Sequence, residues 1–186
     1  MSGRTSRNPL YFDWVAVPGT PGGRIAMIPL PGRRMPGRPD NPWNRDMDDD
    51  MDAIREWGAA ALVSLVQTDE LVRYGVSDIA ARVPRGIQRF HLPIEDCCAP
   101  GPAWDESWRR DGPAVRRLLA EGRRVVVHCL GGLGRSGTVA ARILVEFGME
   151  PNDAIAAVRA ARPGAIETPE QEAYVRAVMR PAGPNR

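Results

Sequence analysis

The segment from residue 123 to residue 148 constrains the fold more than any other part of this chain. It opens with RRVVVHC, an apolar run rich in β-branched residues that predicts a buried strand. The glycine-rich stretch GGLGRSG follows, and TVAARILVEFG then has the apolar spacing and the terminal glycine of a helix. A buried strand that passes directly into a helix is typical of an α/β domain with a largely parallel sheet.

Other segments alternate in the same way and predict a mostly parallel central sheet flanked by helices. Apolar runs at 14–17 and 24–29 surround the turn sequence PGTPGG and favour an opening hairpin. Further strands are expected at AALVSLV and IQRFHL, and helices at 48–58, 151–162 and 168–180.

Turn and cap residues set the expected limits of the remaining helices. Thr68 and Ser77 each precede an acidic residue, so both are predicted to be N-caps of short helices. The polar segment 93–112 is rich in proline and glycine, and we expect it to be irregular. A helix should follow, with Pro113 near its first turn and Gly122 beyond its end.

A chain of 186 residues, 43% of them hydrophobic, is long enough for one catalytic domain. We expect that domain at residues 11–182, between an N-terminal tail at 1–10 and a C-terminal tail at 183–186. The segment 31–46 is too rich in proline, glycine and arginine for a regular element, which predicts an exposed excursion with solvated arginines.

Charge and cysteine content exclude several classes of protein. Twenty-five arginines and no lysine are mixed with 23 acidic residues, which argues against a dedicated nucleic-acid binder. No stretch approaches the roughly 20 apolar residues of a membrane helix, and the N-terminus has no apolar signal core. Three cysteines do not suggest a disulfide framework. We therefore expect a soluble, cytoplasmic protein without a membrane partner, and its oligomeric state stays open.

A cysteine and an arginine six positions later flank the glycine-rich turn. A short loop there can curl so that successive backbone N–H groups point inward, and the helix N-terminus adds its partial positive charge. Glycines allow the backbone angles that such a loop needs, and the arginine guanidinium can bind two phosphoryl oxygens at once. The sequence thus predicts a phosphate cradle between Cys129 and Arg135, formed by Leu130, Gly131, Gly132, Leu133, Gly134 and Arg135.

The same positive field favours the thiolate form of Cys129, which is the nucleophilic form of a cysteine. Displacing an alcohol or a phenol from phosphorus also requires a proton for the leaving oxygen. Asp96 is the best candidate for that acid, because it follows the strand IQRFHL and a parallel sheet brings its loop to the edge that holds the cradle. Glu95 and Asp105 remain alternatives.

The string HCLGGLGRSGT resembles the signature loop of the Cys-x5-Arg protein phosphatases, and it is most similar to bacterial-type members of the dual-specificity group around cyclin-dependent-kinase-associated phosphatase. HLPIEDCCAP, RPGAIETPEQEAYV and RIAMIPLPGR are similar to further segments of that group, so the resemblance covers most of residues 12–180. It implies a three-layer domain that hydrolyses phosphotyrosine, phosphothreonine or phosphoserine in proteins through a cysteinyl-phosphate intermediate. No metal or organic cofactor is expected.

The resemblance also implies roles for individual residues. Asp96 is expected to act first as acid and then as base, and Ser136 to donate a hydrogen bond to the departing thiolate. His128 is expected to orient the loop, and Gln171 to position the hydrolytic water. Structural roles are open for the last three: an N-cap for Ser136, a packed core histidine for His128 and a capping box for Gln171.

The two remaining cysteines lie directly after the predicted acid. Cys97 and Cys98 are expected to fill space beside the acid loop. A disulfide between one of them and Cys129 under oxidation is a further hypothesis, because the reactive thiolate is the susceptible partner.

Several other functions remain open at this point. Gly132-x-Gly134-x-x-Gly137 also fits a dinucleotide fingerprint, although that reading leaves Cys129 and Arg135 unexplained. A non-catalytic phosphate-binding module and a sulfurtransferase share the strand, loop and helix. A phosphoinositide phosphatase is less favoured, because lipid-directed relatives often have lysines in the loop and this chain has none. We find no segment resembling a tyrosine-recognition loop, which favours a shallow dual-specificity site.

Overall fold

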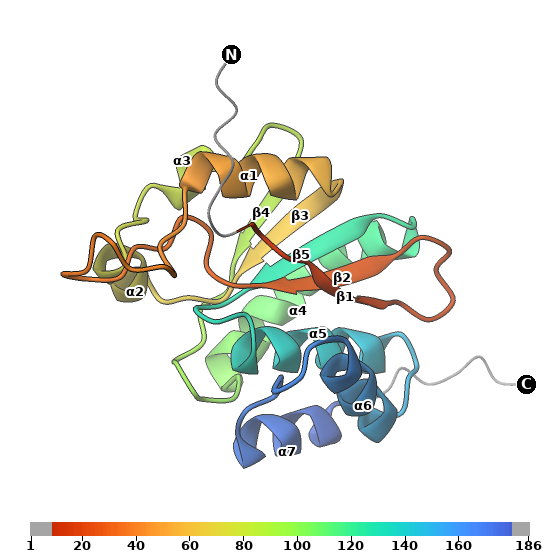
Figure 1. The fold of residues 1–186 in the computed structure, drawn as a ribbon. Coiled ribbons are helices and arrows are strands. Elements are labelled where there is room, and N and C mark those ends of the chain that lie inside the picture. The colour runs from red at the N-terminus through yellow and green to blue at the C-terminus, as the bar shows by residue number, and fades with distance from the viewer. Residues whose placement is uncertain (1–8, 180–186) are drawn as a thin grey trace, which may run out of the picture.

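Five strands form one sheet in the order β1-β2-β5-β3-β4 in the computed structural model, which describes residues 9–179 (Figure 1). Strand β1 runs antiparallel to β2, as the hairpin prediction requires, and the other neighbours are parallel. The strands are β1 Asp13–Ala16, β2 Arg24–Ile28, β3 Ala59–Ser64, β4 Gln88–His91 and β5 Arg124–His128. The mixed α/β class expected from the sequence is therefore confirmed.

Helices cover both faces of the sheet, with α1 and α3 above it and α4, α5, α6 and α7 below it in Figure 1. The α-helices are α1 Met47–Glu56, α2 Thr68–Arg73, α3 Ile79–Arg82, α4 Pro102–Ala120, α5 Gly134–Glu146, α6 Pro151–Ala161 and α7 Pro169–Ala177. None of the helices among the described residues combines the length and the apolar character needed to cross a bilayer.

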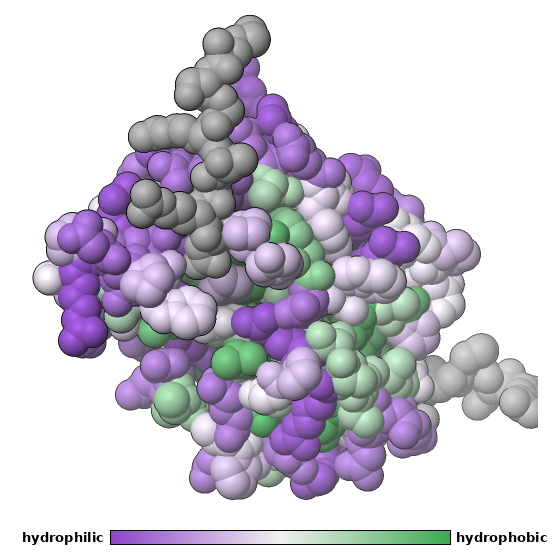
Figure 2. Space-filling view, viewed as in Figure 1, coloured by the Kyte–Doolittle hydropathy of each residue, from purple (hydrophilic) through white to green (hydrophobic). Residues whose placement is uncertain are grey.

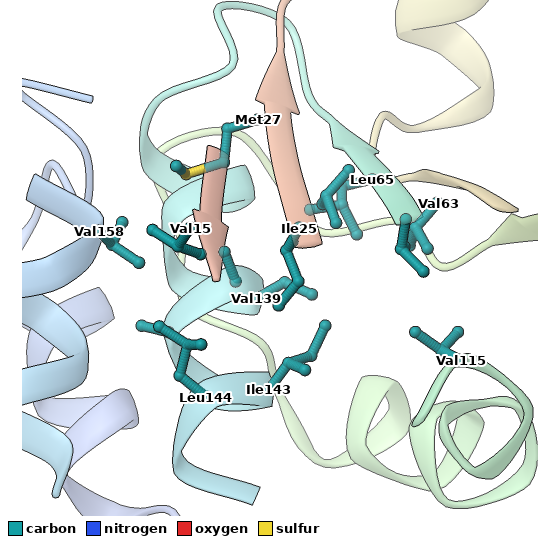
Figure 3. Close-up of a cluster of buried hydrophobic side chains, with 14 of the residues drawn as sticks. Val15, Ile25, Met27, Val63, Leu65, Val115, Val139, Ile143, Leu144 and Val158 are labelled. Carbon is teal, nitrogen blue, oxygen red and sulfur yellow. The ribbon is translucent and has the colours of Figure 1, made fainter. Parts of the chain in front are cut away.

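The strands contribute alternate residues to two cores, as the period of two along a strand requires. Ile25 and Met27 of β2 belong to the core with α4 to α7, whereas Ala26 and Ile28 belong to the core with α1 to α3. Figure 3 shows the larger core, in which side chains from the sheet lie opposite Val139 of α5. Both faces of the central strands are thus buried, which explains their nearly continuous apolar sequences.

The carboxyl ends of the parallel strands meet at one edge of the sheet. His128 at the end of β5 pairs with Ile28 at the end of β2 and with Ser64 at the end of β3. Ser64 in turn pairs with His91, the last residue of β4. The loops that follow these strands therefore begin side by side, although they are far apart in the sequence.

Helix α4 begins eleven residues earlier than Pro113, so the expectation of an irregular segment at 93–112 is wrong for its second half. Pro102 is the first helical residue, and Pro113 lies inside the helix instead of in its first turn. Buried Trp104 and Trp108, four positions apart, form one face of the helix, and their rings stack at 5.3 Å. Gly122 lies beyond the end of the helix with a φ of 75°, as predicted.

The predicted N-caps of the two short helices are each displaced by one residue. Gln67 is the N-cap of α2 and Thr68 is its first residue, while Asp78 instead of Ser77 is the N-cap of α3. A capping box joins Gln67 and Glu70, whose carboxylate accepts the Gln67 backbone N–H at 2.8 Å.

The excursion at 31–46 contains no helix or strand, but its arginines are not all solvated. Arg45 is buried and forms a two-bond ion pair with buried Asp50 of α1, at 2.7 and 2.8 Å. Arg33 is half-buried and donates to the Leu130 carbonyl at 3.2 Å. These contacts attach the excursion to α1 and to the loop after β5. The ends of the chain at 1–8 and 180–186, which include most of the predicted tails, lie outside the described residues.

Candidate active site

The loop from Cys129 to Arg135, which we call the phosphate cradle, joins the end of β5 to the first turn of α5. Cys129 is 3% exposed, and its Sγ accepts the backbone N–H of Gly132 at 3.2 Å. Gly132 has a φ of 73°, and a Cβ at this position would collide with the backbone of Ile28 and Pro29. A glycine is thus required where the loop folds back over the end of β2.

The first turn of α5 brings its positive end next to the thiol. Gly134 is the first helical residue and Leu133 is the N-cap, so the structural alternative of Ser136 as an N-cap is wrong. Ser136 lies in the first turn instead, fully buried, and its hydroxyl has no hydrogen-bond partner among the described residues. A buried hydroxyl without a partner is unusual in a folded protein and is typical of a functional site.

Arg135 is held by a carboxylate that the sequence analysis did not identify. Glu70 of α2 accepts hydrogen bonds from both terminal nitrogens of the guanidinium, at 2.6 Å and 2.9 Å. The Ile94 carbonyl accepts a third bond at 3.0 Å. The arginine side chain is 1% exposed, and its Nε–H has no acceptor among the described residues. These three bonds fix the plane of the guanidinium and leave two of its five N–H donors, the Nε–H and one on Nη2, for other acceptors.

Asp96 reaches the same guanidinium from the loop after β4. Its Oδ1 lies 2.9 Å from Nη2 of Arg135, and its side chain is 57% exposed. The predicted acid, the predicted clamp and the predicted nucleophile therefore lie in one site. Asp105, an alternative acid, lies on α4 and accepts the Tyr174 hydroxyl at 2.7 Å, where it also pairs with Arg142.

The acid loop, residues 95–98, is a tight turn on the surface. Cys97 has a φ of 60°, and both Cys97 and Cys98 are exposed, so the expectation that they fill space is wrong. The Asp96 carboxylate is the main cause that raises the pKa of the Cys97 thiol above its ordinary value. The proposed disulfide with Cys129 stays a hypothesis, because all three cysteines are free thiols here.

Gln171 connects the acid loop to the segment before α7. Its side-chain oxygen accepts the Glu167 backbone N–H at 2.8 Å, and its amide donates to the Cys98 carbonyl at 3.1 Å. Thr168 and Gln171 form the capping box of α7, as one of the two open roles for Gln171 anticipated. Glu167 in turn accepts the Gly134 backbone N–H at 2.7 Å. The acid loop, the phosphate cradle and the start of α7 are thereby held together.

His128 is a fully buried core residue at the end of β5. Neither ring nitrogen makes a hydrogen bond of ordinary geometry with the described residues. Burial lowers the pKa of His128 to about 3, the charge of Arg135 adds to this shift, and the interaction with the Cys129 backbone opposes it. The imidazole is therefore neutral at pH 7 and is suited to packing below the loop.

Glu70 and Glu167 are the site residues that sequence reasoning missed. A signal for Glu70 was available, since it follows β3 by six residues and β3 ends at the same edge of the sheet as β5. No comparable signal pointed to Glu167, because its contact with Gly134 depends on how α7 packs against α5.

Comparisons with known proteins agree with this geometry. The family model "Swiss Army Knife protein, DSP-PTPase phosphatase domain" matches residues 43–175. The chain is 30% identical over 128 residues to protein tyrosine phosphatase type IVA 3 of Homo sapiens, covering 69% of each protein. It is also 30% identical over 137 residues to cyclin-dependent kinase inhibitor 3 of Rattus norvegicus, covering 70% of this chain and 62% of the relative.

Solved structures with the same fold are also phosphatases. Kinase-associated phosphatase, solved with its catalytic-site cysteine replaced by serine, superposes with a TM-score of 0.78 at 26% identity, over 90% of this chain and 93% of that one. The active form of Tk-PTP superposes with a TM-score of 0.63 at 30% identity, over 84% and 91% of the two chains. The chain therefore belongs to the DSP-PTPase family of cysteine-dependent protein phosphatases.

Proposed function

We propose that the protein removes phosphate from phosphotyrosine, phosphothreonine or phosphoserine side chains, with Cys129 as nucleophile and Arg135 as phosphate clamp. One observation supports this assignment above the others. A buried thiol accepts a backbone N–H of its own loop, while Asp96 lies 2.9 Å from the arginine that ends the same loop. The nucleophile, the anion-binding group and the proton donor are therefore close enough to contact the same phosphorylated side chain.

In the first step the Cys129 thiolate attacks phosphorus, an S–P bond forms and the P–O bond to the side chain breaks. Asp96 gives its proton to the departing oxygen, which makes alcohols and phenols adequate leaving groups. The N–H groups of the cradle and the free Nε–H of Arg135 donate hydrogen bonds to the equatorial oxygens and stabilise their negative charge.

In the second step a water molecule attacks the cysteinyl phosphate. Asp96, now a carboxylate, takes a proton from that water, and the S–P bond breaks to return the thiolate. The buried Ser136 hydroxyl donates a hydrogen bond to the departing sulfur, a role supported by its lack of any other partner among the described residues. Gln171 acts on this step through the acid loop, because its amide holds the Cys98 carbonyl.

We place the reaction in the reducing cytoplasm, with phosphorylated proteins as partners. Cys129 must remain a free thiol for the chemistry, and all three cysteines of the chain are free. A nucleic-acid partner is not part of the proposal, because the 25 arginines are balanced by 23 acidic residues.

The test is hydrolysis of p-nitrophenyl phosphate and of a phosphopeptide panel in EDTA by wild type, Cys129→Ser and Asp96→Asn. We expect no turnover by Cys129→Ser. Asp96→Asn should lower kcat by about 10²–10⁴ for phosphopeptides, and by less for p-nitrophenyl phosphate, whose leaving group needs no proton.

Folding of each variant is checked by circular dichroism and by its unfolding midpoint. A wild type that binds vanadate but hydrolyses no phosphoester contradicts the proposal and indicates a phosphate-binding module. Sulfur transfer from thiosulfate without phosphatase activity indicates a sulfurtransferase instead.

A further inference from the structure

A cavity of about 530 Å³ adjoins the phosphate cradle on its outer side. Gly131 and Leu133 of the cradle form one wall, so the site of hydrolysis and the cavity share the same loop. Three arginines, from the excursion and from the end of α6, form much of the rest: Arg33, Arg45 and Arg162.

The three arginines differ in how their charge is compensated. Arg45 is paired with buried Asp50, and Arg162 is paired with Asp13 and donates to the Gly131 carbonyl at 2.9 Å. Arg33 forms no ion pair with any described residue. Within the part of the chain that the structure describes, the one hydrogen bond of the Arg33 side chain is to the Leu130 carbonyl, and its buried Nε–H has no acceptor.

An anion beside Arg33 would stabilise its charged side chain. Burial and the nearby charge of Arg45 lower the pKa of Arg33, which means that its cationic form is disfavoured where it lies. Asp50 opposes this effect but is already bound by Arg45 through both oxygens. An anionic group in the cavity would supply the missing counter-charge and an acceptor for the free Nε–H.

Two exposed aromatic side chains border the same cavity. Tyr11 is 69% exposed and Trp43 is 62% exposed, and both line it. Large aromatic side chains beside arginines are enriched where proteins bind other chains, because they bury much area with little loss of conformational freedom.

Tyr11 and Arg33 lie outside the part of the chain that the family model matches, residues 43–175. We propose that the cavity is a second anion subsite, which binds a phosphorylated or acidic side chain close in the substrate to the phosphorylated residue that is hydrolysed. The inference rests on the proposed function and specifies its substrate class as multiply acidic phosphopeptides.

A peptide fits the observations better than a membrane lipid. Purple and pale residues cover most of the face in Figure 2, and the green residues lie in small separate groups, so this face offers no broad apolar surface for a bilayer. The aromatic border instead offers stacking and hydrogen-bonding groups of the kind that hold an extended chain.

Binding is measured first, because it does not depend on turnover. Cys129→Ser protein is titrated with two kinds of phosphotyrosine peptide. The reference peptide has no second anion, and each peptide of the series has one added phosphoserine or glutamate at a position from −4 to +4 relative to the phosphotyrosine. We expect phosphoserine at one or two adjacent positions of the peptide to lower Kd about tenfold or more relative to the reference peptide, and glutamate at the same positions to lower it by less. The gain should shrink as salt is raised from 50 to 500 mM, since screening weakens charge interactions.

The second measurement separates binding by Arg33 from support of the loop. In the Arg33→Met background the ratio of Kd values for the singly and doubly anionic peptides should fall to about one, and Arg33→Lys should keep part of it. If Arg33 only supports the loop, its replacement should weaken the binding of both peptides by the same factor and leave the ratio of their Kd values as it is in the Arg33 protein. Arg38→Met is the matched control, because Arg38 belongs to the same excursion, is exposed and does not line the cavity.

Each remaining outcome decides the inference. A ratio near one at every position in Cys129→Ser overturns the second subsite, while turnover of singly phosphorylated peptides by wild type leaves the proposed function intact. The second subsite is also overturned if Arg38→Met removes the preference for the doubly anionic peptide and Arg33→Met does not. A preference for doubly phosphorylated short-chain inositol lipids, without any for the peptides, identifies a lipid headgroup as the occupant and likewise contradicts the proposal.

Discussion

Arg135 is oriented by Glu70 and not by the cradle that it serves. A guanidinium with two bonds to one carboxylate has a fixed plane, so its remaining N–H groups point in fixed directions. Preorganised donors of this kind stabilise developing charge without having to reorganise during the reaction. Glu70 is thus a positioning residue for the phosphate clamp.

The Glu70→Gln variant tests this role. We expect kcat/KM for phosphopeptides to fall about 10- to 100-fold, because one of the two charge-assisted bonds is lost and the guanidinium can rotate. Vanadate affinity should fall in parallel. Asp69→Asn is the matched control, since Asp69 is the exposed neighbour in the same helical turn. Equal activity of wild type and Glu70→Gln would show that the cradle alone orients Arg135.

At this scale the sequence predicted what a local pattern can encode. The spacing of Cys129 and Arg135 placed both at a strand-to-helix loop, and the position of Asp96 after another strand of the parallel sheet, β4, placed it at the same edge. Glu70 lay in a helix whose N-cap was displaced by one residue, and nothing in TDELVRYG identifies which of two adjacent acids points to the arginine. That choice is made by tertiary packing.

Among the elements, α4 departs most from its sequence signals. Gly112 and Pro113 together resemble a helix start, yet both lie inside α4. The side chain of Trp108 explains why a glycine is present there. A Cβ at Gly112 would lie 2.7–2.9 Å from three atoms of the Trp108 indole, whose N–H donates to Glu146 of α5 at 2.8 Å. The packing of Trp108 therefore requires a glycine at position 112. The spacing of Trp104 and Trp108 by four residues could have indicated that the helix begins before them.

The two adjacent positions should respond to alanine with opposite signs. Gly112→Ala should lower the free energy of unfolding by about 1–3 kcal/mol, because the methyl group overpacks the tryptophan. Pro113→Ala should raise it by about 1–2 kcal/mol, because Pro113 is exposed and alanine restores an N–H for the Arg109 carbonyl.

Urea unfolding followed by tryptophan fluorescence measures both changes. Phosphatase activity of Pro113→Ala serves as the control for intact tertiary structure, since Pro113 lies far along α4 from the acid loop. Destabilisation by both substitutions would show that the proline ring packs against a neighbour in solution and is not merely tolerated.

The whole molecule has a buried neutral histidine below its active site, and this has a consequence for stability. The pKa of His128 is about 3 in the folded protein and about 6.5 in the unfolded chain. Between these values the unfolded chain binds the extra proton, so protonation favours unfolding. The free energy of unfolding should therefore be unaffected by this group above pH 6.5 and should decrease as pH falls towards 3.

A single such group contributes a slope of up to about 1.4 kcal/mol per pH unit below pH 6.5. Urea unfolding at pH 7.5, 6.5, 5.5 and 4.5 should give a shallower slope for His128→Gln than for wild type. If that variant does not fold, proton NMR of wild type provides the answer. One of its two histidines should show no titration between pH 8 and pH 5, and two ordinary titrations would contradict the buried neutral state.

At the same scale, the mostly parallel sheet and its opening hairpin followed from the alternating apolar and helical segments, whereas the order of the strands, β1-β2-β5-β3-β4, was not predicted. The sequence could not place residues 31–46, because their attachment depends on ion pairs such as Arg45 with Asp50 that have no periodic signature. That excursion forms one side of the cavity beside the cradle.

The contact between Asp96 and Arg135 gives the site a resident counter-ion. In the proposed mechanism a phosphoryl group that enters the cradle replaces the Asp96 carboxylate at Nη2 while both bonds to Glu70 remain, so binding exchanges one of two counter-anions for another. Once displaced from the guanidinium, the Asp96 carboxylate loses the cation that favours its charged form, so it can take up the proton that the proposed mechanism passes to the ester oxygen. When inorganic phosphate leaves, the carboxylate can return to the guanidinium, and product release should therefore carry a smaller electrostatic penalty than it would for an arginine paired with Glu70 alone.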